Sequence, residues 1–209
     1  MGAKKRWCPA ASETITSQQC GEGREERYLC PLDCEYLTEA RMHEKPREVA
    51  PEEFPNRDVR VTEEFLKRNE PLLTFAAPML AMAALEAEAC DADIREALAA
   101  LIQTYRTLES GLIYDTKPAN PYAASIYTRM RELAQKLAEE IAKQTGSHTL
   151  RDADMLGIYV FLESLAIQHD NGRRRGRRFL TFLLAYFPPA EAMQGAQDEA
   201  EPESGLITG

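Results

Sequence analysis

The chain has 209 residues and a formal net charge of −9. A chain of this length can bury one hydrophobic core without staples, so we expect one core-bearing domain and a smaller appendage. Much of the negative charge falls in residues 190–209, and the rest of the chain is close to neutral, which argues against nucleic-acid binding over the whole surface.

The N-terminus and the apolar stretches favour a cytoplasmic protein of bacterial type. No apolar run follows Lys4, Lys5 and Arg6, as a secretory signal would require. The longest apolar stretches, 72–85 and 179–187, are shorter than the roughly 18 to 20 residues that a membrane-spanning helix needs. We therefore expect no membrane partner.

Composition divides the chain into four parts. Residues 1–44 hold four of the five cysteines and should form a metal-binding module. Residues 45–60 contain three prolines and many charges, which indicates a linker. Residues 61–189 carry apolar residues at helical spacing, whereas the acidic residues 190–209 have few large apolar side chains and should be a disordered tail.

The first helical stretch runs from about Thr62 to Ala89. Pro71 suits the first turn of a helix, and Pro78 removes one backbone donor, so we expect two helices or one kinked helix. Apolar residues lie on every side of residues 72–85, which predicts a central position in the core.

Capping signals mark the next two helices. Asp93, with Glu96 three positions on, predicts a capping box that opens a helix continuing to about Leu108. Asn120 followed by Pro121 predicts the cap and first turn of a third helix.

Two more helices should follow. Thr149 and Asp152 suggest a further capping box, and Asn171 with Gly172 predicts a left-handed stop after this helix. The last helix should end near Phe187, before two prolines. Because the connections are short, the sequence predicts an all-α fold, an antiparallel bundle of four to six helices with a small zinc-ribbon-like module of four cysteines at its N-terminus.

The cysteine pattern is the strongest chemical signal. Cys8, Cys20, Cys30 and Cys34 supply the four soft ligands that a tetrahedral zinc ion prefers. Cys30 and Cys34 form a close pair, and the glycines after Cys20 suggest a zinc knuckle, whereas the gap from Cys8 to Cys20 is long for one. In a reducing cytosol zinc is favoured over disulfides or free thiols, and an iron–sulfur cluster, which uses the same ligands, stays open as an alternative.

At these residues the chain resembles a group of uncharacterised bacterial proteins with a cysteine-rich start that ends in a CP-x-DC-x-YL-x-x-AR phrase. Here the phrase runs from Cys30 to Arg41, and a later G-x-x-Y phrase at Gly111 and Tyr114 is also similar. The resemblance implies a metal-binding start on an alanine-rich helical domain of unassigned activity, with a tighter first cysteine pair than the one found here.

No catalytic constellation is evident. Cys90 has no histidine placed beside it by the sequence and is expected to be a structural or idle thiol. His43 lies close enough to the cysteines to replace Cys8 as a zinc ligand. His148 and His169 are expected to be ordinary residues near helix ends, and no Glu-x-x-His spacing for a di-iron bundle occurs.

A run of arginines is the second notable feature, and it consists of Arg173, Arg174, Arg175, Arg177 and Arg178. Five cations at the start of a helix oppose its dipole, which suggests an anionic partner. The simpler interpretation is a solvated turn whose arginines pair with carboxylates of the helical domain or of the tail.

The sequence therefore predicts a zinc-binding interaction or regulatory protein, more in keeping with a non-enzyme than with an enzyme, whose partner is another protein. One alternative is a nucleic-acid-associated module that uses residues 4–6 and 173–178. Another is an enzyme or small-ligand binder with a pocket between helices, lined by tyrosines at positions 105, 114, 127 and 159.

Overall fold

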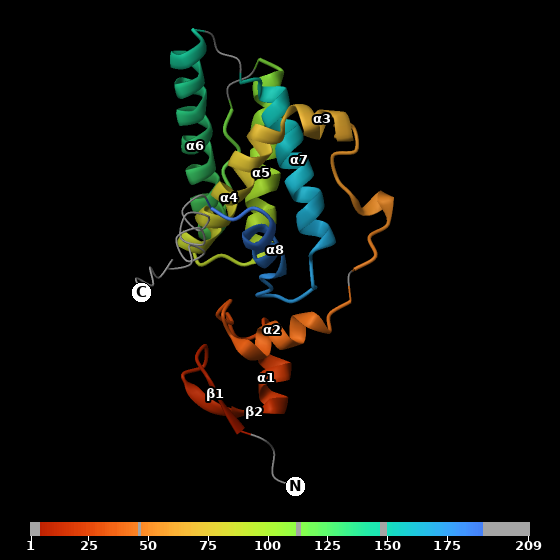
Figure 1. Cartoon of the computed structure of the whole chain (residues 1–209), viewed down its shortest axis with the longest axis vertical. Helices are drawn as coiled ribbons and strands as arrows, with labels where there is room; N and C mark the ends of the chain where they lie inside the picture. The colour runs from red at the N-terminus through yellow and green to blue at the C-terminus, as the bar shows by residue number, and fades with distance from the viewer. Residues whose placement is uncertain (1–4, 46, 112–113, 147–149, 190–209) are drawn as a thin grey trace, which may run out of the picture.

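The computed structural model describes residues 5–45, 47–111, 114–146 and 150–189. Within these ranges it contains eight α-helices and one two-stranded sheet, so the prediction of a mainly helical chain is confirmed. A small module of residues 5–44 lies below a larger helical domain (Figure 1). The tail predicted at 190–209, His148 and Thr149 lie outside the described residues.

The module begins with a β-hairpin. Strand β1 (Lys5–Cys8) pairs antiparallel with β2 (Glu13–Thr16), and Cys8 lies opposite Glu13. Helix α1 (Ser17–Gly23) follows directly, because the Thr16 hydroxyl accepts from the backbone N–H of Gln19 while the Gln19 side chain accepts from the backbone N–H of Thr16.

This capping box corrects one expectation for the module. Cys20 and the glycines after it lie in α1 and form no knuckle, since the helix started by Thr16 continues through them. The segment from Glu25 to Leu29 is a turn with one isolated bridge, between Arg24 and Tyr28. Helix α2 (Glu35–Met42) completes the module.

The segment predicted as a linker packs onto the helical domain. It contains one 3₁₀ turn, η1 (Pro51–Glu53), and Val59 is partly buried against the core. Asn56 donates to Glu163 at 2.8 Å, and Arg106 forms a two-pronged ion pair with Asp58 at 2.5 and 2.8 Å. Proline and charge content therefore identified irregular backbone, but not its attachment.

The first predicted helical stretch is two helices, α3 (Glu63–Arg68) and α4 (Glu70–Glu86), which meet at Asn69. Pro71 lies in the first turn of α4 and Pro78 inside it. Alanines and leucines are buried along most of α4, in agreement with its expected central place.

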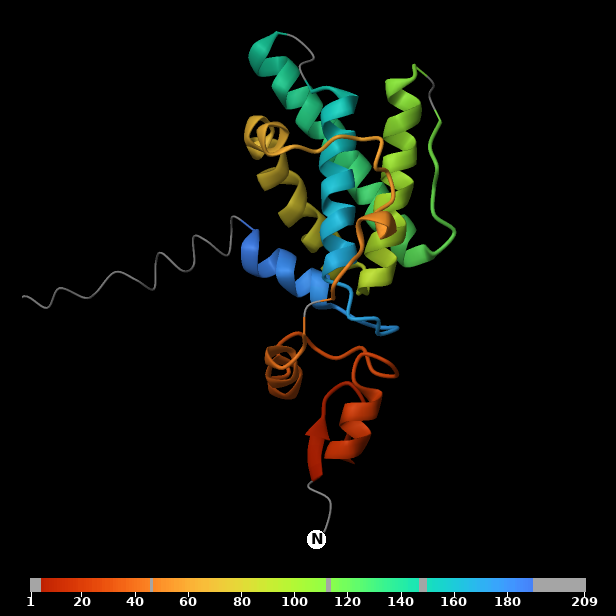
Figure 2. The same ribbon diagram turned by 90° about the vertical axis from the view of Figure 1, so that its right-hand side faces the viewer.

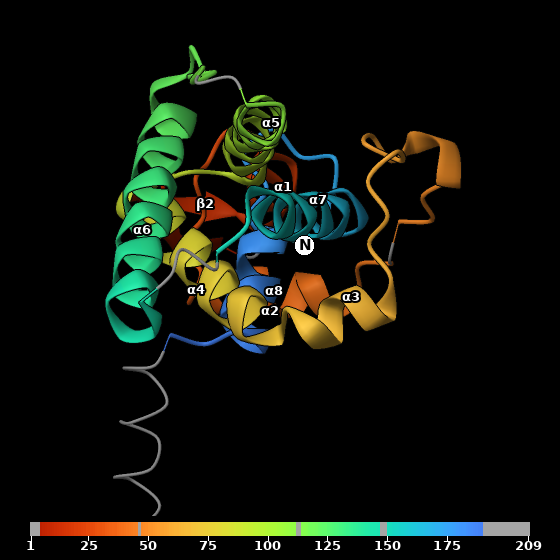
Figure 3. The same ribbon diagram turned by 90° about the horizontal axis from the view of Figure 1, so that it is seen from above.

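Four more helices complete the domain, and they are α5 (Asp91–Glu109), α6 (Pro121–Thr145), α7 (Asp152–Gln168) and α8 (Arg178–Tyr186). Helix α5 packs along α6 and α7, and α4 contacts α6, α7 and α8 (Figures 2 and 3). One continuous core lies between them, with Tyr127, Tyr159 and Phe179 among its largest fully buried side chains. Each such side chain contributes roughly 1.5–3 kcal/mol through burial.

The helix starts agree with the sequence signals only in part. Helix α6 begins as predicted, with the Asn120 side chain accepting from the backbone N–H of Tyr122 at 3.0 Å. Helix α5 begins two residues before the predicted cap: Cys90 is the N-cap, and Asp93 is the third helical residue, whose carboxylate accepts from the backbone N–H of Cys90 at 2.8 Å. Asp93 thus fills the reciprocal position of the box.

The later helix ends are close to the expected ones. Helix α7 starts at Asp152 after Arg151 and ends at Gln168, and Gly172 beyond it has a φ of 70°, which favours glycine. Helix α8 ends at Tyr186. None of the helices in the described part of the chain combines the length and the apolar character that crossing a membrane requires.

Candidate metal centre and its junction with the helical domain

The four cysteines of the module come from four different segments. Cys8 ends β1, Cys20 lies in α1, Cys30 lies in the loop before α2, and Cys34 is the N-cap of α2. Cys8, Cys20 and Cys30 are buried, Cys34 is partly exposed, and none forms a disulfide. All four line one small cavity of about 20 Å³, which is close to the space that one water molecule requires.

The cavity is not a formed metal site. Among the described residues, no group of three or more His, Cys, Asp or Glu side chains is arranged so that it could hold a metal ion. His43 is exposed at the end of α2 and does not line the cavity. The predicted ligands are therefore brought to one place, but not to ligand spacing.

The surroundings of Cys30 disfavour its thiolate form. Burial raises the pKa of the Cys30 thiol, a hydrogen bond from the backbone of Glu25 lowers it, and the charges of Glu25, Cys34 and Cys8 raise it further. These thiols therefore lie near enough to oppose each other's ionisation. A metal ion bound among the thiols would offset that repulsion and lower the pKa of the Cys30 thiol.

Two arginines line the same cavity. The guanidinium of Arg6 lies over the Tyr36 ring, 4.1 Å from its centroid. The Nε of Arg24 is buried and has no hydrogen-bond partner within the described ranges. A zinc ion with four thiolate ligands has a net charge of about −2, so a cationic wall with an unused donor suits it. The residue types around the cavity are those that a zinc–thiolate group would require, whereas the spacing of the four thiols is not that of a formed site.

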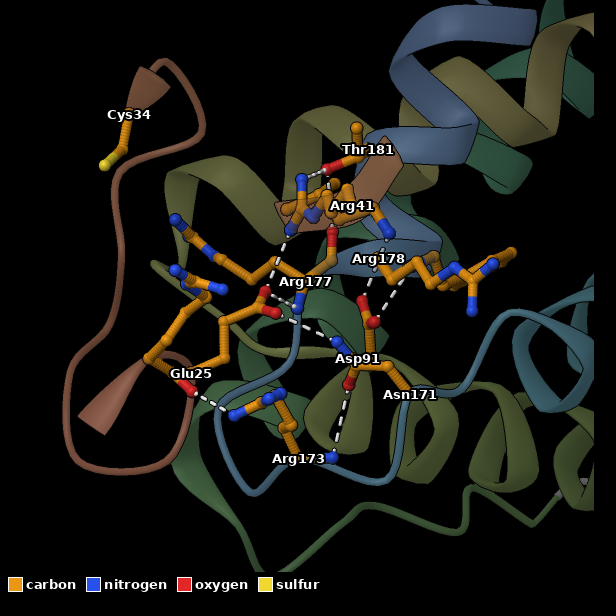
Figure 4. Close-up of polar contacts among 12 residues, drawn as sticks. Glu25, Cys34, Arg41, Asp91, Asn171, Arg173, Arg177, Arg178 and Thr181 are labelled. Carbon is orange, nitrogen blue, oxygen red and sulfur yellow. Dashed lines mark hydrogen bonds and ion pairs between the residues drawn. The ribbon is translucent and has the colours of Figure 1, made fainter. Parts of the chain in front are cut away.

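Glu25 connects this centre to the helical domain (Figure 4). Its side chain is fully buried and accepts from Arg41 of α2 at 2.8 Å, from the Asn171 amide at 2.9 Å and from the backbone N–H of Arg177 at 2.8 Å. Its backbone carbonyl accepts from the backbone N–H of Arg175 at 2.6 Å. One residue therefore contacts Cys30, α2 and the α7–α8 loop.

The arginine run lies at this junction and not on one free face. Arg173 donates to the backbone carbonyl of Arg24 at 2.8 Å, and the buried Arg177 donates to that of Ala89 at 3.0 Å. Arg178 donates to the carbonyl of Lys45 at 3.3 Å. The side chains of Arg174 and Arg175 are exposed.

The basic residues at the start of the chain do not join this run. Strand β1, which carries Lys5 and Arg6, lies at the end of the module away from the helical domain, whereas residues 173–178 lie at the junction of the domain with the module (Figures 1 and 2). Lys4 is outside the described residues.

The start of α8 does not carry five arginines opposed to the helix dipole, as the sequence suggested. Only Arg178 of the run is helical, and Asp91 of α5 accepts from the backbone N–H groups of Phe179 at 2.9 Å and Leu180 at 3.1 Å. Burial raises the pKa of Asp91 to about 7, against the lowering effect of those two hydrogen bonds, and the charge of Glu25 adds to the rise. A carboxyl group remote in sequence thus caps α8.

Neither Glu25 nor Asp91 was singled out from the sequence. Each lies among other acidic residues in a stretch typical of solvated surface, and only the folded chain places it among backbone N–H donors of another segment. No local pattern distinguishes a carboxylate that caps a helix 88 positions away.

The remaining candidates are placed in ordinary structural roles. The Cys90 thiol donates to Asp93 at 3.0 Å, and burial raises its pKa, which is opposite to what a nucleophile requires. His169 stacks on Phe182 with ring centroids 3.9 Å apart. Tyr105 and Tyr127 line a cavity of about 420 Å³.

The other two tyrosines of the expected pocket do not line that cavity. Tyr159 is buried with its ring 5.3 Å from that of Tyr105, and Tyr114 is exposed. No protein-family model, no curated protein and no solved structure matches this chain.

Proposed function

We propose that this chain is a non-catalytic zinc-binding protein whose N-terminal module presents a surface to another protein. The observation that carries the proposal is the convergence of four cysteines, from four segments, on one cavity of about 20 Å³. Cys8, Cys20, Cys30 and Cys34 are the ligands. Binding draws their sulfur atoms inward from their present spacing.

The bound ion has a structural role. Zinc with four thiolate ligands keeps no open position for water and is a poor Lewis acid, so it holds segments together. The module needs such support, because beyond its thiols only two of its aliphatic side chains are buried among the described residues, Ile15 and Leu37. Arg6 and Arg24 balance the charge of the zinc–thiolate group.

A protein partner is supported by exposed apolar side chains on the module. The Trp7 side chain is 60% exposed on β1, and Met42 is 73% exposed at the end of α2. Tryptophan and methionine are enriched at protein interfaces, and an exposed tryptophan beside a metal-ordered hairpin is a natural anchor.

The proposal is tested by the emission of Trp7. Trp7 is the single tryptophan of the chain and borders the cysteine cavity, so its emission reports on the module, whereas far-ultraviolet circular dichroism reports on the helical domain. Chelation of the purified protein should shift the emission with little change in helicity, and added zinc should reverse it.

Two variants sharpen this test. Cys30→Ser should abolish the zinc response, whereas Cys90→Ser, which removes the thiol that lies outside the module, should retain it. A protein whose emission ignores both chelator and zinc, with the cysteines reduced, would contradict the proposal.

A further inference from the structure

A charged cleft of about 380 Å³ lies where the module, the linker and the helical domain meet. Four basic side chains and two acidic ones line it, and they are Lys45, Arg47, Arg173, Arg178, Glu44 and Asp170. No cysteine borders the cleft, so it is separate from the proposed zinc centre.

The two acidic residues hold arginines in place. Asp170 lies 3.7 Å from Arg47, and it also pairs at 2.7 Å with Arg95, which stands outside the cleft, and accepts from the backbone N–H of Gly172 at 3.0 Å. Glu44 lies 3.9 Å from Arg178. The four cations outnumber the two carboxylates. Two partners outside the cleft offset each other, because Arg95 pairs with Asp170 while Glu53 pairs with Arg47, so an excess of two cations remains.

The guanidinium groups keep unused capacity. Arg173 and Arg178 each donate to a neutral backbone carbonyl, of Arg24 and Lys45 respectively. Such an acceptor leaves the charge of Arg173 uncompensated, whereas Arg178 has the Glu44 carboxylate at 3.9 Å. A guanidinium has five N–H donors in a planar fork, so both groups can donate further. This geometry suits the oxygens of a phosphate group better than a single carboxylate.

We propose that the cleft binds one phosphate group, either free or as the monoester of a small molecule. A phosphate monoester has a charge of about −1.5 to −2 at neutral pH, which matches the excess of cations in the cleft. The carboxylates of Glu44 and Asp170 would repel a continuous chain of phosphates, which disfavours nucleic acid. Arg47 and Arg178 come from opposite sides of the junction, so the ligand also fastens the linker to α8.

The test is binding of inorganic phosphate and of glycerol 3-phosphate to the full chain, by calorimetry and melting temperature at constant ionic strength. Both probes should bind saturably and raise the melting temperature, whereas glycerol should not. Tighter binding of glycerol 3-phosphate would identify a monoester as the ligand, and equal or tighter binding of phosphate would identify the free ion.

Substitutions separate this site from general attraction. Arg47→Gln, at a half-exposed side chain, and Arg178→Gln should each weaken phosphate binding about tenfold or more. Arg174→Gln removes the same charge from an exposed position outside the cleft and should have little effect. The proposal is overturned if neither probe binds, if Arg174→Gln weakens binding as much as Arg47→Gln, or if an oligonucleotide binds more tightly than both probes with a steep salt dependence.

Discussion

Replacement of Glu25 by glutamine should loosen the module from the helical domain. The Glu25 carboxylate is fully buried, and its three donors belong to α2 and to the α7–α8 loop with the start of α8. Glutamine keeps the shape but replaces one acceptor oxygen with a donor, which then faces one of those N–H groups. The charge of Arg41, whose side chain is 13% exposed, loses its partner.

The expected loss is large. Removal of one partner from a buried ion pair costs about 3–5 kcal/mol, because the other charge stays buried without compensation. Arg41 also bonds the Thr181 hydroxyl, and that contact recovers only part of the loss. Equilibrium urea unfolding, followed by circular dichroism and by Trp7 emission, measures the change in the free energy of unfolding.

The two signals should separate in the variant. The module should unfold at lower urea concentration than the helical domain and should become sensitive to protease first. Glu26→Gln is the matched control, because it removes the same charge from the neighbouring, partly exposed side chain and should change stability by less than about 0.5 kcal/mol. A loss below about 1 kcal/mol for Glu25→Gln, with coincident transitions, would refute the reasoning.

The remaining predictions concern the helical domain and the tail. The pKa of Asp91 is raised from 3.8 to about 7, so the folded chain retains a proton that the unfolded chain releases. The free energy of unfolding should therefore fall as pH rises from about 4 to about 7, by up to about 1.4 kcal/mol per pH unit. In urea unfolding at several pH values, Asp91→Asn should remove that part of the slope. The Tyr159 hydroxyl is buried without a hydrogen-bond partner in the described part of the chain, so Tyr159→Phe should leave the melting temperature unchanged or raise it. Tyr127→Phe loses a 2.9 Å hydrogen bond to Thr104 and should lower stability by about 1 kcal/mol. A larger loss of stability for Tyr159→Phe than for Tyr127→Phe would contradict this. Deletion of residues 190–209 should leave the melting temperature unchanged, and a loss of several degrees would show that the tail docks.

Capping residues predicted the start of a helix correctly where only neighbouring residues decide it. Asn120 and Pro121 start α6 as expected, because both the cap and the first-turn proline act within three residues. Asp93 was predicted to be the N-cap of α5, but it lies three positions after the N-cap, Cys90. The prediction was wrong because an aspartate at either position is a common helix-start signal. The glycines after Cys20 misled for the opposite reason: the capping box at Thr16 outweighs their low helix propensity.

The sequence predicted which cysteines lie together in the fold, but not what surrounds them. Clustered cysteines in the sequence are sufficient to name Cys8, Cys20, Cys30 and Cys34, and the structure brings all four to one cavity. The roles of the arginine run depend on which carbonyls and carboxylates of distant segments the fold supplies. Contacts between segments far apart in the chain produce no repeating pattern in the sequence. From the sequence alone these arginines are therefore expected to be solvated.

The most direct test of the central proposal is the metal content of freshly purified full-length protein, measured by elemental analysis together with a count of reactive thiols. One tetrahedral site should give about one zinc per chain, with all four module cysteines recovered as thiols after chelation. Cys30→Ser should lower the zinc content, and Cys90→Ser should not. Protein without metal, in which fewer than four of these cysteines react as thiols, would indicate disulfides and contradict the account; iron with acid-labile sulfide in place of zinc would replace the proposed ion by a cluster.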